Sequence, residues 1–206
     1  MARFVGRENV RKRLEPLAGQ AGSSVYAGGS ARIATEDETL AVTPPFGLDH
    51  NGSYDRVELE PLLEALARDH TVAAILVRRG GYAVGVFEGE RLVASKVGTR
   101  FVKGRHKKGG SSSNRFRRRR EEQERELLDA ATATAHAVLE PHCDRIEFLA
   151  LGGDRGAATH VADELPWLAD RRLARFFDVP DPRQRVLERL PYDLYAAEVT
   201  EERGPL

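Results

Sequence analysis

The sequence contains a single cysteine, Cys143, among its 206 residues. One thiol cannot build an internal disulfide framework or a cysteine-based zinc cluster. No apolar run approaches the roughly 20 residues that cross a bilayer, and the N-terminal segment lacks the apolar core of a secretory signal. Hydrophobic residues make up 41% of the chain, which excludes a wholly disordered protein. We therefore expect a soluble, cytoplasmic, monomeric protein.

Lysine is also scarce, and the positive charge is unevenly distributed. The formal net charge is +0, yet residues 100–120 contain ten Lys or Arg and no Asp or Glu. The rest of the chain holds 22 basic and 32 acidic residues, and three of the five lysines lie inside this window. A concentrated basic segment on an acidic body predicts a polyanionic partner for that segment.

The first 50 residues have the pattern of a small accessory element. Apolar residues at helical spacing predict a short amphipathic helix over 6–18. Three short strands are expected near 23–27, 31–34 and 39–43. Turn-forming residues are dense over 43–53, and we interpret this stretch as a linker between the accessory element (1–50) and a larger domain (54–206).

The remainder of the chain predicts an α/β domain. Residues 71–77 form a continuous apolar run rich in β-branched side chains, which is typical of a buried central strand. Strands that alternate with helices indicate a mixed sheet covered by helices. The expected helices are 58–69, 114–139, 155–164 and 182–190, and the expected strands are 71–77, 82–87, 91–97, 145–151, 172–179 and 193–199.

The string from Gly104 to Gln123 carries most of the functional information. It begins with a basic arm, Gly104 to Lys108, and continues with Gly109, Gly110 and three serines. A tip with so little side-chain bulk can enter a confined space and present backbone N–H groups to an oxyanion or a phosphate.

The helix expected to follow this tip starts with the wrong charge for its position. Five arginines occupy its first turns, where the helix dipole is already positive, and the glutamates come after them, which is the less favourable order for pairing one turn apart. Such a violation of local rules indicates that a negative group from outside the fold supplies the balance. Phosphates would do so. The arginines are Arg115, Arg117, Arg118, Arg119 and Arg120.

This string resembles the signature of the catalytic middle domain of archaeal and eukaryotic class I peptide-release factors. That signature consists of a basic loop, Gly-Gly-Gln-Ser, Arg-Phe and an Arg-rich helix, and residues 109–117 align with it without a gap. The resemblance extends from about Tyr54 to Val199 and is strongest to the actinobacterial branch of the Vms-type release-factor-like group. It implies the release-factor middle-domain fold and ribosome-associated hydrolysis of peptidyl-tRNA, with no cofactor, metal or membrane involved.

The resemblance also implies roles for individual residues. Gly109, Gly110 and Ser111 would form the catalytic tip, and large-subunit rRNA and peptidyl-tRNA would be the partners. Ser111 stands where the family has glutamine, so a backbone N–H is kept and a carboxamide is lost. The residues that would grip RNA phosphates are Lys103, Arg105, His106, Lys107, Lys108, Arg115, Arg117, Arg118, Arg119 and Arg120.

Other interpretations remain open at this point. The chain could be a non-catalytic RNA- or ribosome-binding module that keeps the release-factor shape. A Ser111–His106 dyad would lack a nearby acid to orient the imidazole, and a nuclease would need a carboxylate cluster beside the basic loop, which the sequence lacks. The Gly-rich segment 152–156 lacks the Lys-Ser/Thr pair of a P-loop and predicts a strand-to-helix turn. His136, His142 and His160 have no metal-ligand spacing.

Overall fold

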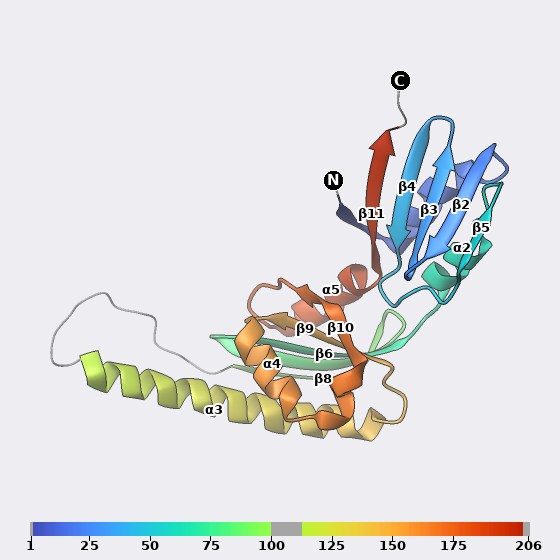
Figure 1. Cartoon of the computed structure of the whole chain (residues 1–206). Coiled ribbons are helices and arrows are strands. Elements are labelled where there is room, and N and C mark those ends of the chain that lie inside the picture. The colour runs from blue at the N-terminus through green and yellow to red at the C-terminus, as the bar shows by residue number, and fades with distance from the viewer. Residues whose placement is uncertain (1, 100–112, 204–206) are drawn as a thin grey trace. The chain divides into compact units, whose positions relative to one another are not determined.

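The computed structural model describes residues 2–99 and 113–203. The chain forms two compact units. One consists of Met1–Asp69 together with Tyr192–Leu206, and the other is the continuous stretch His70–Pro191. The first unit therefore takes segments from both ends of the sequence, and both units can be followed in Figure 1.

The first unit is a six-stranded antiparallel sheet with helices on one face. The strand order is β1-β11-β4-β3-β2-β5. In β3, Ala31 and Ile33 are buried while Arg32 is exposed, which is the alternation of a half-buried strand. Val10 from α1 and Leu62 from α2 join the buried face. The elements are β1 (Arg3–Gly6), α1 (Arg7–Leu14), β2 (Gly22–Ala27), β3 (Ser30–Thr35), β4 (Glu38–Thr43), β5 (Gly52–Tyr54), α2 (Glu60–Ala67) and β11 (Ala196–Arg203).

The second unit is built around a five-stranded mixed sheet. The order is β10-β9-β6-β7-β8. Strands β10, β9 and β6 are parallel to one another, whereas β6, β7 and β8 form an antiparallel meander. The elements are β6 (Thr71–Arg78), β7 (Gly81–Glu88), β8 (Arg91–Thr99), α3 (Ser113–Leu139), β9 (Phe148–Gly153), α4 (Arg155–Asp163), β10 (Arg172–Phe177) and α5 (Gln184–Leu194).

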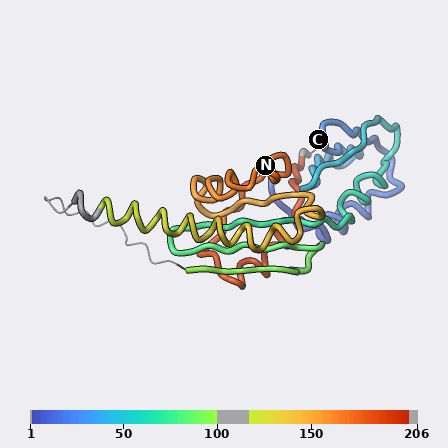
Figure 2. Tube along the Cα trace, turned by 90° about the horizontal axis from the view of Figure 1, so that it is seen from below, coloured from blue at the N-terminus to red at the C-terminus, as the bar shows by residue number. Residues whose placement is uncertain are grey.

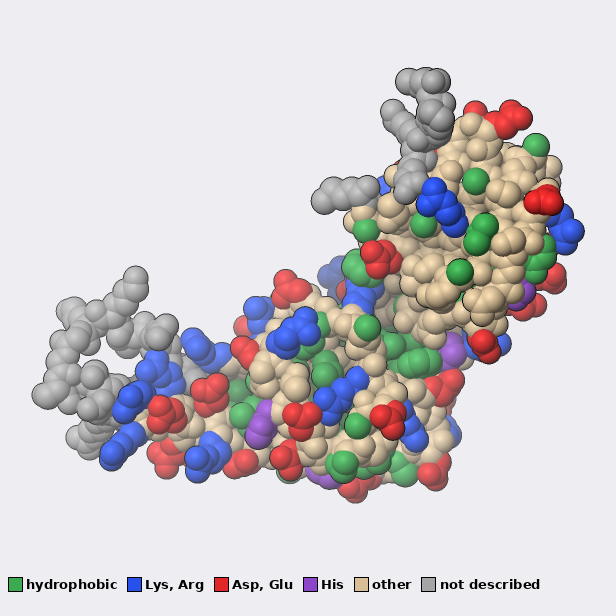
Figure 3. Space-filling view, in the orientation of Figure 1, with side chains coloured by type: hydrophobic (Ala, Val, Ile, Leu, Met, Phe, Trp, Pro, Cys, Tyr) green, Lys and Arg blue, Asp and Glu red, His purple; other side chains and the backbone are tan. Residues whose placement is uncertain are grey.

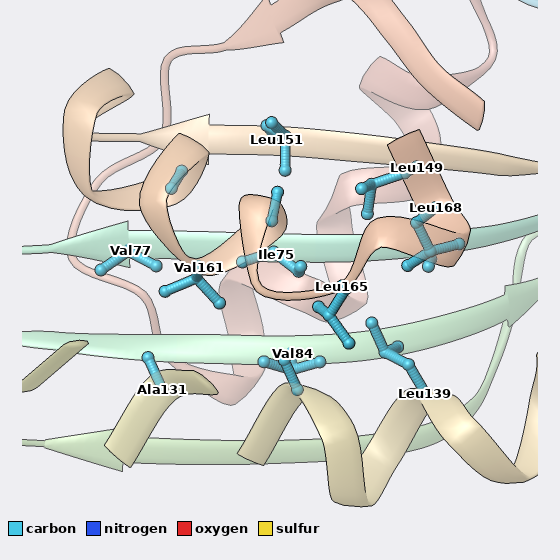
Figure 4. Packing of buried hydrophobic residues seen from close by; sticks show 14 of the residues in the cluster. Ile75, Val77, Val84, Ala131, Leu139, Leu149, Leu151, Val161, Leu165 and Leu168 are labelled. Atoms are coloured by element: carbon cyan, nitrogen blue, oxygen red, sulfur yellow. The ribbon is translucent and has the colours of Figure 1, made fainter. Parts of the chain in front are cut away.

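The two faces of this sheet are covered by different helices. Side chains of Ile75, Val77 and Val84 point toward α3 and α4, where they meet Ala131, Leu139 and Val161 (Figure 4). Helix α5 packs on the opposite face, because Leu187 is the close neighbour of Gly85 on β7. Val72 to Val77 are all fully buried, which explains why β6 is apolar at every position instead of alternating.

The predicted α/β class, with a mixed sheet covered by helices, is confirmed in the second unit. The last expected strand, 193–199, does not join this sheet as the sequence suggested. Strand β11 lies between β1 and β4 in the first unit and pairs antiparallel with both. Val199 is buried there in the same cluster as Val10 and Leu14 of α1. Its burial therefore depends on residues near the other end of the chain.

Candidate nucleic-acid interface

Helix α3 has two halves with different surroundings. Leu127, Ala131, Ala135 and Leu139 are buried against the sheet at helical spacing. Between residues 117 and 126 no side chain is buried. Figure 2 shows this half of the helix extending past the end of the sheet. We call residues 117–126 the free half of α3, in the sense that none of its side chains is buried against the sheet.

The free half begins with four consecutive arginines. Successive residues of an α-helix are rotated by about 100°, so Arg117 to Arg120 point to all sides of the helix axis. Arg117, Arg118 and Arg119 are exposed and Arg120 is half-buried. Lys and Arg side chains gather over this part of the molecule, with Asp and Glu among them (Figure 3). The helix can therefore contact negative groups on more than one side.

Carboxylates within the helix neutralise these arginines weakly. Arg117 Nε lies 3.8 Å from Glu121 Oε1, and the two side chains are 62% and 64% exposed. An exposed ion pair of this kind stabilises by about 0–1 kcal/mol. The first turn of α3 also contains no acidic residue. The positive end of the helix dipole therefore lies beside the arginines without a carboxylate to offset it.

The two units differ in charge. Residues 70–191 hold 23 Lys or Arg and 17 Asp or Glu, whereas the remaining residues hold 9 and 15. The excess of positive charge belongs to the unit that contains α3. A polyanion would be attracted to this unit and repelled by the other.

Most of the predicted site residues lie outside the described part of the chain. Arg115 belongs to α3 by its backbone, and Arg117 to Arg120 are placed with their side chains. The predicted residues outside the described ranges are Lys103, Arg105, His106, Lys107, Lys108, Gly109, Gly110 and Ser111.

The segment that holds these residues is bounded by two elements of one unit. Strand β8 ends at Thr99 and α3 begins at Ser113. A cross-strand contact links Tyr82 on β7 to Gly98, its register partner on β8. A Cβ atom on Gly98 would overlap with the Tyr82 ring. The Thr134 hydroxyl of α3 donates a buried hydrogen bond of 3.1 Å to the Tyr82 hydroxyl oxygen.

Tyr82 and Thr134 were not singled out by the sequence. Alternation along β7 places Tyr82 on the same face as Val84 and Val86, which is the face that α3 covers. A tyrosine among these valines indicates a buried hydroxyl that needs a partner. Thr134 lies within the apolar stripe of α3, next to Ala135. The pairing of these two hydroxyls depends on how α3 is placed on the sheet, which neither the strand pattern nor the helix pattern specifies.

The other sequence candidates have ordinary structural surroundings. His136 pairs with Glu140 at 2.6 Å on the surface of α3, and His142 Nδ1 lies 2.8 Å from Arg145 Nη2. The segment after β9 is the predicted strand-to-helix turn, where the Asp154 carboxylate accepts from the Ala157 amide and caps α4. Within residues 2–99 and 113–203, no group of three or more His, Cys, Asp or Glu side chains is arranged to hold a metal.

A comparison with protein families matches residues 70–200 to the "Actinobacteria/chloroflexi VLRF1 release factor" family. The chain belongs to this family. The match confirms the predicted resemblance to actinobacterial release-factor-like proteins. It covers the whole of the second unit, including β8 and α3, and continues to residue 200 in β11.

Several solved structures have a similar arrangement of the chain. An archaeal translation termination factor, aRF1, is 18% identical with a TM-score of 0.45, and the match covers 92% of this chain and 55% of that one. The Vms1 mitochondrial localization core is 10% identical with a TM-score of 0.45, covering 93% and 80%. Dom34 of S. cerevisiae is 9% identical with a TM-score of 0.36, covering 89% and 60%. The chain thus spans little more than half the length of the archaeal factor.

Two further findings are negative. No curated protein matches the sequence. Among the described residues, no helix is both long and apolar enough to span a membrane.

Proposed function

We propose that this protein hydrolyses the ester bond between a nascent peptide and tRNA on stalled large ribosomal subunits in the cytoplasm. The observation that carries the proposal is the family match over residues 70–200. The free half of α3 supports it, because arginines on all sides of an exposed helix suit a partner made of phosphates. We assign both catalysis and RNA binding to the unit His70–Pro191, which has the excess of positive charge.

In this proposal the reaction is attack by water on the ester carbonyl carbon. Gly109 and Gly110 let the tip come close to the reacting atoms, since neither carries a Cβ. The Ser111 backbone N–H stabilises the oxyanion that develops on the carbonyl oxygen. The bond between the carbonyl carbon and the ribose oxygen then breaks. One proton of the attacking water ends on the ribose oxygen, the other passes to solvent, and the peptide leaves with a free carboxylate. The basic residues from Lys103 to Arg120 hold RNA phosphates.

One observation favours a second function. Ser111 occupies the position at which the resemblance implies glutamine, so a side chain that would help to position the water is missing. A protein that binds the ribosome without hydrolysing peptidyl-tRNA would tolerate this change. We therefore keep a non-catalytic ribosome-binding module as the alternative.

Release of labelled peptide from purified ribosome–peptidyl-tRNA complexes tests the proposal. We expect the wild-type protein to release peptide and the Gly110→Ala variant to lose nearly all activity. A Cβ atom at the tip would keep the backbone from coming close to the ester. Gly80→Ala is the matched control. Gly80 lies exposed in the β6–β7 turn, and a Cβ there meets no atom within 4 Å.

The outcomes separate the two functions. Activity of the wild type and of Gly80→Ala, with loss in Gly110→Ala, supports hydrolysis at the tip. Binding to ribosomes without release by the wild type would favour the non-catalytic module. Equal release by the wild type and Gly110→Ala would place the chemistry elsewhere in the chain.

A further inference from the structure

We propose that Tyr82 is a positioning residue for peptide release. Through Gly98 and Thr134 it fixes the direction in which the free half of α3 leaves the sheet, relative to the end of β8. The inference rests on the proposed function for its kinetic consequence, while its geometric content can be tested without any activity.

The first contact lies on the β8 side. Gly98 is the register partner of Tyr82 and the second-to-last residue of β8. The aromatic ring leans across the glycine so closely that a Cβ atom there would overlap with it. An aromatic side chain that covers a cross-strand glycine pins the register of the pair. The end of β8 is thereby held in place under the Tyr82 ring.

The second contact lies on the α3 side. The Tyr82 and Thr134 side chains come within 3.1 Å at their hydroxyl oxygens, and the two residues are 7% and 5% exposed. Tyr82 belongs to the buried apolar cluster that also contains Ala131, Ala135 and Val84. Thr134 and Ser24 are the polar residues that the described part of the chain buries. A buried hydroxyl needs a partner at a defined distance and angle, so this bond restricts how α3 rotates and slides on the sheet.

A small change at this bond becomes a large change at the arginines. Arg117 lies 17 residues before Thr134, which at about 1.5 Å per residue is about 26 Å along the helix axis. A tilt of about 5° at Thr134 would move Arg117 by about 2 Å over that length. Leu127 and Ala131, which are buried between Thr134 and the free half, limit such a tilt, but no side chain of residues 117–126 is buried to correct what remains.

Packing alone would not require the two hydroxyls. Phenylalanine and valine have nearly the same shapes as tyrosine and threonine, and they would fill the same space without polar atoms to satisfy. In some proteins a buried polar group is retained because it specifies one arrangement among several well-packed ones. Tyr82 and Thr134 fit this role, since the helix segment beside them carries small alanines that permit sliding.

The geometric test uses nitroxide labels at Lys96 and Glu122 on a Cys143→Ser background. Lys96 is exposed on β8 and Glu122 is exposed on the free half of α3. We expect the distribution of label distances to broaden in Tyr82→Phe and in Thr134→Val, and to stay narrow in Thr134→Ser, which keeps the hydroxyl. Tyr26→Phe is the matched control, because Tyr26 is a buried tyrosine in the other unit whose hydroxyl donates to the Glu58 carbonyl at 2.5 Å.

The kinetic test compares the same variants in the release assay. We expect kcat to fall about tenfold or more in Tyr82→Phe and Thr134→Val, because a misplacement of about 1 Å can cost about 10²-fold. KM for the ribosome complex should rise by a smaller factor than kcat falls, since every arginine is retained although displaced. Thr134→Ser should restore kcat, and Tyr26→Phe should leave it at the wild-type value.

Two results would overturn the inference. One is a label-distance distribution in Tyr82→Phe as narrow as that of the wild type. The other is a kcat for Tyr82→Phe equal to that of Tyr26→Phe. If the wild type itself releases no peptide, the proposed function fails, whereas the distance distributions still decide whether Tyr82 orients the helix.

Discussion

The Arg117 guanidinium lies 3.8 Å from the Glu121 carboxylate, one helical turn further along α3. Both groups are largely exposed, so the pair contributes little to folding. Arg118 and Arg119 are also exposed, with no ion pair found for them among the described residues. The arginines of the free half are therefore available to an outside partner at almost no cost to stability.

Replacing Arg117, Arg118 and Arg119 with alanine should weaken ribosome binding and make it less sensitive to salt. The slope of log affinity against log salt should become shallower by about 0.7–0.9 for each phosphate that the variant no longer neutralises. Thermal unfolding should change little. Sedimentation with ribosomes over a salt series measures the slope.

The control for this prediction removes the same charge elsewhere in the unit. Arg183, Arg185 and Arg189 are exposed at or near α5, and their triple alanine variant should keep the wild-type slope. A lower unfolding temperature of the α3 variant, with an unchanged salt dependence of ribosome binding, would mean that these arginines stabilise the fold instead of binding RNA.

Substitutions at Ser111 should separate the backbone from the side chain. We expect Ser111→Ala to retain most of the release activity, because its backbone N–H is unchanged, and Ser111→Gln to preserve or raise the activity. Loss of one oxyanion donor typically lowers the rate by about 10²–10³. The release rate of Gly110→Ala should therefore fall far more than that of either Ser111 variant. An inactive Ser111→Ala beside an active Gly110→Ala would indicate a serine nucleophile assisted by His106.

Removing the cap of α4 should destabilise the second unit. The Asp154 carboxylate accepts from the Ala157 amide at 3.0 Å at the start of this helix. Asp154→Ala should lower the free energy of unfolding by about 1 kcal/mol. Asp154→Asn should keep most of the stabilisation, because its side-chain oxygen can also accept from the Ala157 amide. Trp167 is the single tryptophan and packs against the core of this unit, so its fluorescence in urea reports the change. Equal stability of the alanine and wild-type proteins would contradict the capping role.

The first unit should lose stability in alkali through Tyr26. Burial, together with the nearby Glu58 carboxylate, raises the pKa of Tyr26 from 10.0 to about 12. Because the folded state holds this proton more tightly than the unfolded state, its contribution to stability is complete below pH 10 and is lost as the pH rises through about 12. A spectrophotometric titration of the five tyrosines should show one that ionises late, and Tyr26→Phe should remove it. Ionisation of every tyrosine near pH 10 would argue against the effect.

The sequence predicted the elements of the second unit well because their patterns are local. Helix α3 starts one residue before its expected start and ends at the expected Leu139, since the apolar stripe and Pro141 define it. The run from Val72 to Val77 predicted β6 for the same reason. Of the site, the arginine-rich start of α3 was predictable because four consecutive arginines at a positive helix end violate a local rule.

The features that sequence patterns missed depend on contacts between distant residues. Strand β1 is four residues long and only Gly6 in it is buried, so it has no apolar signal of its own. It exists because its backbone pairs with β11, about 190 residues later. The bond between Tyr82 and Thr134 likewise depends on how far α3 slides along the sheet, which neither segment specifies by itself.

The position of β11 sets an order of events during synthesis. This strand lies between β1 and β4, so the six-stranded sheet keeps a gap until residues 196–203 have left the ribosomal exit tunnel. The second unit is complete in sequence before that point and can fold first. A chain truncated before Ala196 would therefore contain a finished arginine-bearing unit, and β4 would present an unpaired edge open to pairing with another chain.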